Sequence, residues 1–142
     1  MKIHLVTIGK PKLAYAQAGW EEYIGRLKHF HQLHITHIPD KNNTAPFIIS
    51  AVGSASLVAL VIDGPQYSSH ELANFLETQA LSGREVCFVI GGPDGLMPEV
   101  IARADKTLGL SKLTFPHDLA MVVLAEALYR ASTITAGQPY HR

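Results

Sequence analysis

A glycine-rich loop follows an apolar, β-branched run in the second half of the chain. The run Val86–Ile90 leads directly into Gly91–Gly95, of sequence Gly-Gly-Pro-Asp-Gly. In open α/β sheets, ligands bind just beyond the carboxyl ends of strands, where glycine lets the backbone approach a ligand closely. We therefore interpret this loop as one wall of a ligand pocket. The alternative is a tight turn without a ligand, which the same residue types favour.

The spacing of the glycines in this loop excludes two common phosphate sites. Neither a phosphate-binding loop that ends in Gly-Lys-Ser/Thr nor the dinucleotide-binding fingerprint is present in the chain. Paired acidic metal ligands are also missing near the loop. These absences disfavour a nucleotide hydrolase.

A second segment with free backbone groups runs from Leu110 to His117. Pro116 disfavours helical geometry at Phe115, so the residues before it are expected to be extended, with polar groups that no helix consumes. His117 and Asp118 then begin a helix, where the partial positive charge favours an anion and disfavours a protonated imidazole. The alternative for His117 is a cap of this helix.

The end of the chain carries an ion-pair spacing and a polar tail. Glu126 and Arg130 are four residues apart on one helical face, and a structural salt bridge is the default interpretation. The tail Tyr140–Arg142 combines a stacking ring, an imidazole and a bidentate phosphate donor, a mixture that RNA recognition uses. Because chain termini usually fray, the tail alone does not establish a site.

Four histidines, His29, His31, His34 and His37, crowd a short stretch of the chain. Their spacing does not favour a metal site, because His34 and His37 are expected on opposite faces of a strand and no cysteine lies nearby. A solvated edge is the preferred interpretation. The single cysteine, Cys87, lies within an apolar strand and is expected to be buried and unreactive.

Apolar runs alternate with helical patterns along the whole chain. The predicted strands are Ile3–Ile8, Leu33–Ile38, Leu57–Ile62, Val86–Ile90 and Thr107–Leu110. The predicted helices are Leu13–Phe30, Ser68–Leu81 and Asp118–Ala136, with residues 40–46 as a polar loop and 48–56 left unassigned. This alternation predicts an α/β fold with a mostly parallel sheet flanked by helices.

Length and composition indicate a single domain over residues 1–142. Hydrophobic residues make up 47% of the chain, and twelve basic residues balance twelve acidic ones, so any nucleic-acid surface must be local. The longest apolar stretch, Leu119–Ala125, is far shorter than the roughly 20 residues of a membrane span. The N-terminus lacks the features of a signal peptide, and with one cysteine a cytoplasmic location is expected.

Leu119–Ala125 is also apolar around the whole circumference of its predicted helix. A helix at the surface of a monomer should show a polar face. If the sheet covers one side, a second copy of the chain is expected to cover the other, which predicts a homodimer. The alternative is that the N-terminal helix folds over this helix within one chain.

Taken together, these segments resemble one protein family. The matching blocks are Ile90–Leu96, Leu110–His117, Leu124–Ala131 and Pro139–Arg142, together with Met1–Ile3 and Gly9-Lys10 near the N-terminus. They resemble the ribosomal RNA large subunit methyltransferase H family, of the SPOUT class. The resemblance implies an α/β fold with a C-terminal trefoil knot that binds S-adenosylmethionine, and a homodimer.

The resemblance also implies an activity, methylation of N3 of a pseudouridine in 23S rRNA of the large ribosomal subunit. The methyl-donor pocket would comprise Leu60, Gly91, Leu110, Ser111, Lys112, Leu113, Thr114 and Phe115. The RNA side would use His117, Arg130, Tyr140, His141 and Arg142, with the tail of one subunit reaching the pocket of the other. His117 or His141 is the hypothetical acceptor of the N3 proton, and the reaction needs no metal.

Two departures from the family pattern leave an alternative open. Met121 stands where the family usually has an arginine, and the region Asp40–Ser56 is shorter and lacks most of a charged helix. A non-enzymatic protein that binds the ribosome on the same fold is therefore the second hypothesis. Calorimetry with the methyl donor separates the two.

Overall fold

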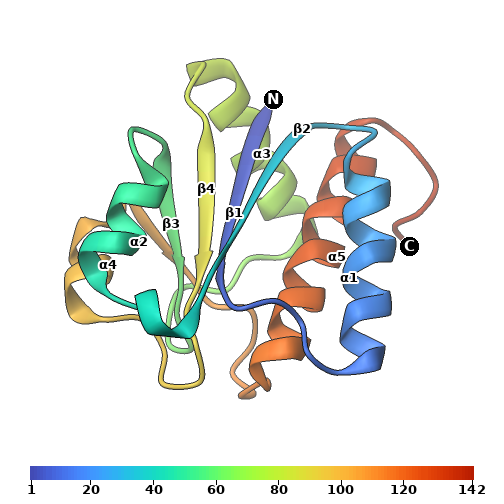
Figure 1. The fold of residues 1–142 in the computed structure, drawn as a ribbon. Coiled ribbons are helices and arrows are strands. Elements are labelled where there is room, and N and C mark those ends of the chain that lie inside the picture. The colour runs from blue at the N-terminus through green and yellow to red at the C-terminus, as the bar shows by residue number, and fades with distance from the viewer.

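The computed structural model describes residues 1–142 and shows a parallel sheet with helices on both faces (Figure 1). The elements are β1 (Lys2–Ile8), α1 (Ala14–Leu27), β2 (Gln32–Ile38), a 3₁₀ turn η1 (Asp40–Asn42), α2 (Ala45–Val52), β3 (Ser56–Leu60), α3 (Ser69–Ser82), β4 (Val86–Ile90), α4 (Pro98–Arg103), β5 (Lys106–Leu108) and α5 (His117–Thr135). The strand order is β2-β1-β4-β3-β5, and every neighbouring pair is parallel. The predicted fold class is therefore confirmed.

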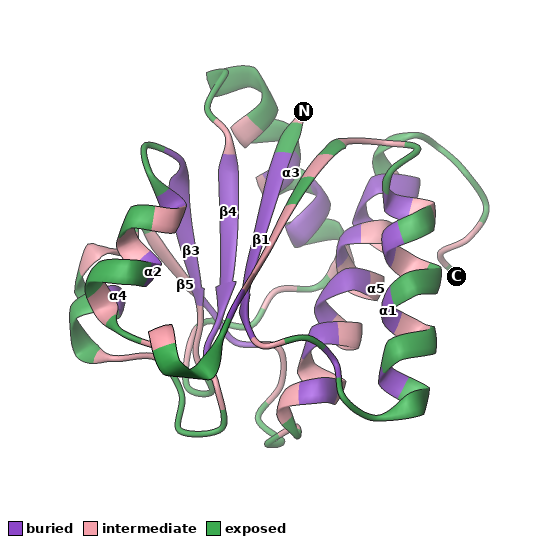
Figure 2. Ribbon diagram, viewed as in Figure 1, coloured by how far each residue is buried: buried purple, intermediate pink, exposed green.

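The sheet separates two apolar cores. On β1, Ile3 and Leu5 face a core formed with α1, α3 and α5, whereas Val6 and Ile8 face a core formed with α2 and α4. This alternation follows from the two-residue period of a strand. The central strands are buried on both faces (Figure 2), as expected when helices cover both sides of a parallel sheet.

One sequence-based assignment is wrong, and one helix was missed. The segment 40–46, predicted as a loop, contains η1 and the start of α2. The Thr44 side chain accepts a hydrogen bond from the Phe47 amide, and Pro46 occupies the first turn of α2, so the polar residues are helix-start signals. Helix α4 was not predicted, since its six residues are too few to show a helical period.

Several strand and helix ends also differ from the prediction, among them those of β3 and β5. β3 ends at Leu60 instead of Ile62, so Val61 and Ile62 belong to a loop. β5 begins at Lys106 and ends at Leu108. The capping box of α3 is confirmed, because Ser68 and Glu71 exchange side-chain to backbone hydrogen bonds.

The apolar first half of α5 is largely covered within the single chain. Helices α1 and α3 both pack against α5, and Met121, Leu124 and Leu128 are fully buried. Gly19 lets α1 approach closely, because a Cβ there would lie 2.9 Å from Cγ1 of Val122. The folded-over arrangement, the alternative to dimerisation, therefore accounts for most of this burial. None of the helices combines the length and apolar content that crossing a membrane requires.

Asp118 fixes the start of α5 to the start of α1. Its Oδ2 accepts hydrogen bonds from the backbone amides of Lys12, at 2.8 Å, and Leu13, at 2.7 Å. These amides precede α1 and have no helical partner of their own. The carboxylate is buried, with 8% of the residue exposed, so the two charge-assisted bonds are shielded from water.

We expect Asp118→Ala to lower the free energy of unfolding by about 2 to 4 kcal/mol, because two amides lose a charged acceptor. Asp118→Asn should cost less, since its amide oxygen still accepts. Urea unfolding followed by circular dichroism measures both. Glu21→Ala, at an exposed position of α1, serves as the control and should stay within about 0.5 kcal/mol of wild type. Equal losses in Asp118→Ala and Glu21→Ala would contradict the proposed anchor.

Candidate functional site

A cavity of about 270 Å³ lies beyond the carboxyl ends of β3, β4 and β5. Three loops that are far apart in sequence form it, at the lower edge of the sheet in Figure 1. Its lining residues are Leu60, Val61, Ile62, Ile90, Gly91, Gly92, Pro93, Gly95, Leu108, Leu110, Ser111, Leu113, Thr114, Phe115, Pro116, His117 and Ala120. Parallel strands place all their carboxyl ends at one edge, which is why these loops meet.

The structure brings together most of the residues that the sequence assigned to the pocket. Those that line the cavity are Leu60, Gly91, Leu110, Ser111, Leu113, Thr114 and Phe115. Lys112 does not line it and instead borders a neighbouring depression with Asp63 and Gln66. The extended segment before Pro116 therefore presents side chains to two different surfaces.

Several lining residues were not assigned from the sequence. Val61 and Ile62 were placed inside a strand that in fact ends at Leu60. Ala120 lies one turn after His117 on α5, and the three-residue spacing could have placed it on the same side. Pro116 was interpreted only as a break before the helix, although it also lines the cavity.

The glycine loop after β4 is both a tight turn and a pocket wall. The Gly95 amide donates to the Gly92 carbonyl at 2.9 Å, which closes the turn. A Cβ on Gly91 would lie 2.6 Å from the carbonyl carbon of Gly95, so only glycine fits there without moving backbone. The loop is therefore a tight turn and also lines the cavity, so the two interpretations of its sequence are compatible.

The segment after β5 lies directly against the loop after β3. The Gly109 amide donates to the Pro65 carbonyl at 2.9 Å, and the Val61 amide donates to the Leu108 carbonyl at 3.0 Å. A Cβ on Gly109 would lie 2.5 Å from the Gly64 oxygen. This backbone contact sets the distance between two walls of the cavity.

His117 lines the cavity and has one ring nitrogen without a hydrogen-bond partner. Its Nε2 donates to the Ile8 carbonyl at 2.7 Å, because a carbonyl oxygen can only accept. In the neutral ring the lone pair is then on Nδ1, which is buried and has no hydrogen-bond partner. The N-cap of α5 is Pro116 with no side-chain cap, so the alternative role of His117 as a cap is wrong.

Arg130, Tyr140 and His141 form a second cluster on α5 and the tail. Arg130 donates from Nη2 to Oε1 of Glu126 at 2.7 Å and from Nη1 to Nδ1 of His141 at 3.2 Å. The Tyr140 hydroxyl lies 3.2 Å from the same Glu126 oxygen and 3.4 Å from the Tyr23 hydroxyl. The sequence indicated the ion pair but not the role of Tyr23, which lies more than a hundred residues earlier.

Burial and hydrogen bonding fix the charge states in this cluster. The bond to Glu126 raises the pKa of Arg130. Burial, followed by the Tyr23 bond and the Glu126 charge, raises the pKa of Tyr140, so its hydroxyl remains a donor. The lone pair of His141 Nδ1 is engaged by Arg130, in contrast to that of His117.

The two clusters do not meet within one chain. Arg130 is thirteen residues after His117 on α5, which corresponds to about 20 Å along the helix axis. Neither Arg130 nor the tail from Tyr140 to Arg142 lines the cavity. The structure therefore separates the residues assigned to the donor pocket from most of those assigned to RNA.

The histidine run does not converge on one point. His31 bonds Ser132, and burial lowers the pKa of His31 to about 4. His37 bonds Thr7 and lies beside Trp20, whereas His34 stacks on His4 on the opposite face of the sheet. The prediction of opposite faces is confirmed. Cys87 is buried, and burial raises its pKa to about 12, in agreement with an unreactive thiol.

Comparison with known proteins identifies relatives across the whole chain. The family model described as "Predicted SPOUT methyltransferase" matches residues 1–141. The chain is 50% identical to ribosomal RNA large subunit methyltransferase H of Deinococcus deserti, with 100% of each chain covered. It is 47% identical to the protein of the same name from Deinococcus radiodurans, over 100% of this chain and 99% of the relative.

A solved structure supports the fold. A probable methylase family protein from Haemophilus influenzae superposes with a TM-score of 0.59 at 14% identity, covering 99% of this chain and 70% of that chain. At this identity the likeness concerns the fold alone. The family match and the two relatives show that the chain belongs to the SPOUT methyltransferases, in the family of ribosomal RNA large subunit methyltransferase H.

Proposed function

We propose that this methyltransferase transfers a methyl group from S-adenosylmethionine to N3 of a pseudouridine in 23S rRNA of the large ribosomal subunit. The convergence of three loops on one mostly apolar cavity carries the proposal. The names of the relatives support a ribosomal RNA substrate. Residues 1–142 would act as one domain, and an rRNA substrate agrees with the expected cytoplasmic location.

The cavity fits S-adenosylmethionine. No carboxylate lines it, and its polar side chains are Ser111, Thr114 and His117, as suits an apolar ring held by a few hydrogen bonds. The missing Cβ of Gly91 lets the loop fold tightly against the backbone of Gly95 and Leu96, and the folded loop forms one wall of the cavity. Leu60, Gly91 and the segment Leu110–Phe115, Lys112 included, would hold the donor, which supplies a sulfonium methyl group when bound.

The chain itself would position the base and remove its proton. Orienting two reactants can lower the barrier by about 7 to 11 kcal/mol. His117 is better placed than His141 to accept the N3 proton, because its Nδ1 is free while that of His141 accepts from Arg130. Arg130, Tyr140, His141 and Arg142 would bind the RNA through phosphate contacts and stacking.

The separation of the two clusters supports a site shared between two copies of the chain. The tail of one subunit would reach the cavity of its partner, since the distance along α5 prevents this within one chain. Ile62 and Leu113, both in the cavity lining, are 62% and 73% exposed, and a partner could cover them. The C-terminal trefoil knot that the family resemblance implies is part of this proposal.

The second hypothesis, a binding protein without turnover, receives no support from Met121. This residue is fully buried in the core between α1, α3 and α5. Because position 121 lies in the core, the replacement of the usual arginine by methionine removes no positive charge from a surface that could contact RNA. The region 40–56 still covers the sheet through α2, with Ile48 and Val52 buried.

Gly91→Ala tests the donor pocket, because its Cβ would force the backbone of Gly95 to move. We expect affinity for S-adenosylmethionine to fall at least about tenfold, or about 1.4 kcal/mol, by calorimetry. Methyl transfer to ribosomes from a strain lacking the gene should fall with it. Gly25→Ala, where a Cβ meets nothing within 4 Å, is the matched control. Wild-type protein that binds no donor would support the binding-protein hypothesis instead.

His117→Ala tests the proton acceptor. The wild-type rate should rise with pH, because only the neutral imidazole can accept the N3 proton. The rate of His117→Ala should no longer rise with pH. The rate of His141→Ala should be lower than that of the wild type but should still rise with pH. Single-turnover rates between pH 5.5 and 8.5 measure the profile. Unchanged slopes in both variants would remove both histidines from the role.

Mixing two impaired variants tests the shared site. Gly91→Ala impairs the cavity and Tyr140→Ala impairs the tail, so a mixed dimer would contain one intact composite site. After exchange of subunits at equal amounts, about a quarter of wild-type activity should return. Activity that stays at the level of the separate variants would place cavity and tail in the same chain.

A further inference from the structure

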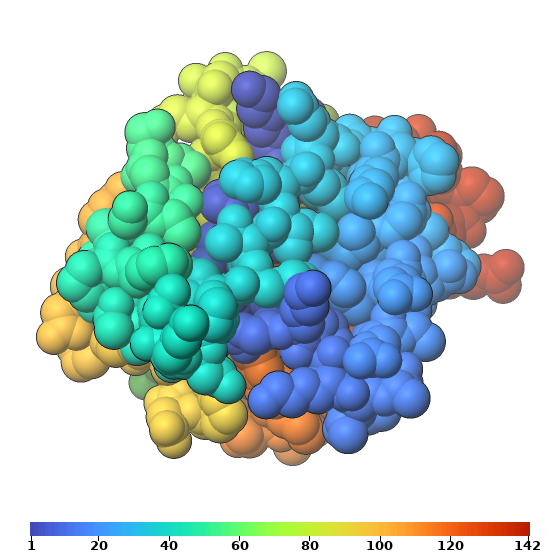
Figure 3. All heavy atoms as spheres, in the orientation of Figure 1, coloured from blue at the N-terminus to red at the C-terminus, as the bar shows by residue number.

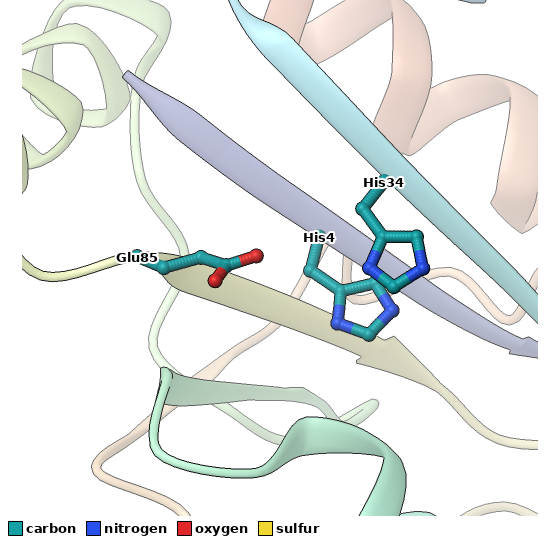
Figure 4. A group of neighbouring side chains, drawn as sticks. All are labelled: His4, His34 and Glu85. Atoms are coloured by element: carbon teal, nitrogen blue, oxygen red, sulfur yellow. The ribbon is translucent and has the colours of Figure 1, made fainter.

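Three side chains with metal-ligand chemistry meet on two adjacent strands and at the start of a third (Figure 4). His4 of β1 is in register with His34 of β2. Glu85 directly precedes Val86, which pairs with Ile3 on the other side of β1. One ligand atom from each of the three residues lies within 4.8 Å of the others.

This cluster lies at the opposite end of the sheet from the methyl-transfer site. His4 and Glu85 are near the amino ends of β1 and β4, whereas the cavity follows the carboxyl ends. His4 shares the face of the sheet that carries Val6 and Ile8, beneath α2. The proposed methyl transfer uses none of these residues.

The cluster carries a negative charge without a partner. Glu85 is half-buried, and its carboxylate makes no hydrogen bond or ion pair, while the adjacent Arg84 pairs with Asp105 at 3.9 Å. In Figure 4 the carboxylate points toward the His4 ring. A half-buried carboxylate with no cation beside it is costly, and a divalent cation would neutralise it.

The two histidines are prepared for a ligand in different ways. His4 is 3% exposed, and its Nε2 bonds the Thr36 hydroxyl at 2.8 Å, which fixes the ring and leaves Nδ1 available. Such a bond to the second nitrogen is typical of metal-binding histidines. His34 is exposed and makes no hydrogen bond, so its ring is free to turn.

We propose that His4, His34 and Glu85 bind one divalent transition-metal ion, with Zn²⁺ as the ion that two imidazoles and one carboxylate favour. A water molecule would complete a tetrahedral site. Zinc ligands at about 2.0 to 2.1 Å from the ion are about 3.3 Å apart, so atoms that lie within 4.8 Å of one another need to approach by at most about 1.5 Å.

One side chain must move for the ion to bind. The rings of His4 and His34 are stacked, with centroids 4.2 Å apart and an angle of 10° between their planes. Because a metal ion lies in the plane of each imidazole that binds it, two parallel rings cannot share one ion. Rotation of the exposed His34 ring removes this conflict without moving the backbone.

The bound ion would join three neighbouring strands. It would tie β2, which is at the edge of the sheet, to β1 and β4. Binding to the folded chain alone would then stabilise it. The sequence predicts no metal site, because its histidines cluster only in the run from His29 to His37 and His4 lies outside that run.

Equilibrium dialysis of the full chain against Zn²⁺, with the metal-free protein as the start, tests the proposal. We expect one ion per chain and a rise in melting temperature with Zn²⁺ concentration. His34→Ala and Glu85→Gln should each weaken binding at least about tenfold and abolish the rise. Both positions are at least partly exposed, so both variants should fold, which circular dichroism verifies.

His29→Ala is the matched control, since it removes an exposed histidine five residues from His34. It should bind Zn²⁺ as the wild type does. The proposal is overturned if the wild type takes up no stoichiometric zinc. It is equally overturned if His29→Ala weakens binding as much as His34→Ala does.

Discussion

The contact between the backbones of Gly64 and Gly109 is the constraint on which the functional end of the molecule depends. These two residues hold the loop after β3 and the segment after β5 at a separation that admits no side chain. The amide of Gly109 and that of Val61 then bond across the same junction. The third loop, which follows β4, turns at Gly91–Gly95 toward this junction. It does not fill the space between itself and the other two loops, and this space is the cavity.

Helix α5 connects this end of the molecule to the rest. Its first residues line the cavity, its middle forms the core with α1 and α3, and its last turns carry Arg130 against the tail. Asp118 fixes the helix in place through the amides before α1. The same helix therefore sets both the position of His117 and the distance from the cavity to the tail, which a single chain does not bridge.

Much of the fold followed from periodicity and local signals. Each long apolar strand and each long helix was visible because its residues repeat at two or at about 3.6. Short or strongly capped elements were missed: α4 has too few residues for a period, and the polar start of α2 has the composition of a loop. The end of β3 was placed too late because Val61 and Ile62 are apolar like strand residues, although they line the cavity and lie outside the sheet.

The sequence by itself determined the order of the long strands and helices, the parallel sheet, the glycine loop and the family blocks, because these depend on residues close together in the chain. It could not determine that Tyr23 meets Tyr140, that α1 covers α5, or that His4 and Glu85 lie beside His34. These residues are far apart in the chain, and nothing in the local sequence around each of them indicates that they are close in space. Only the strand order and the packing of helices on the sheet decide which of them touch.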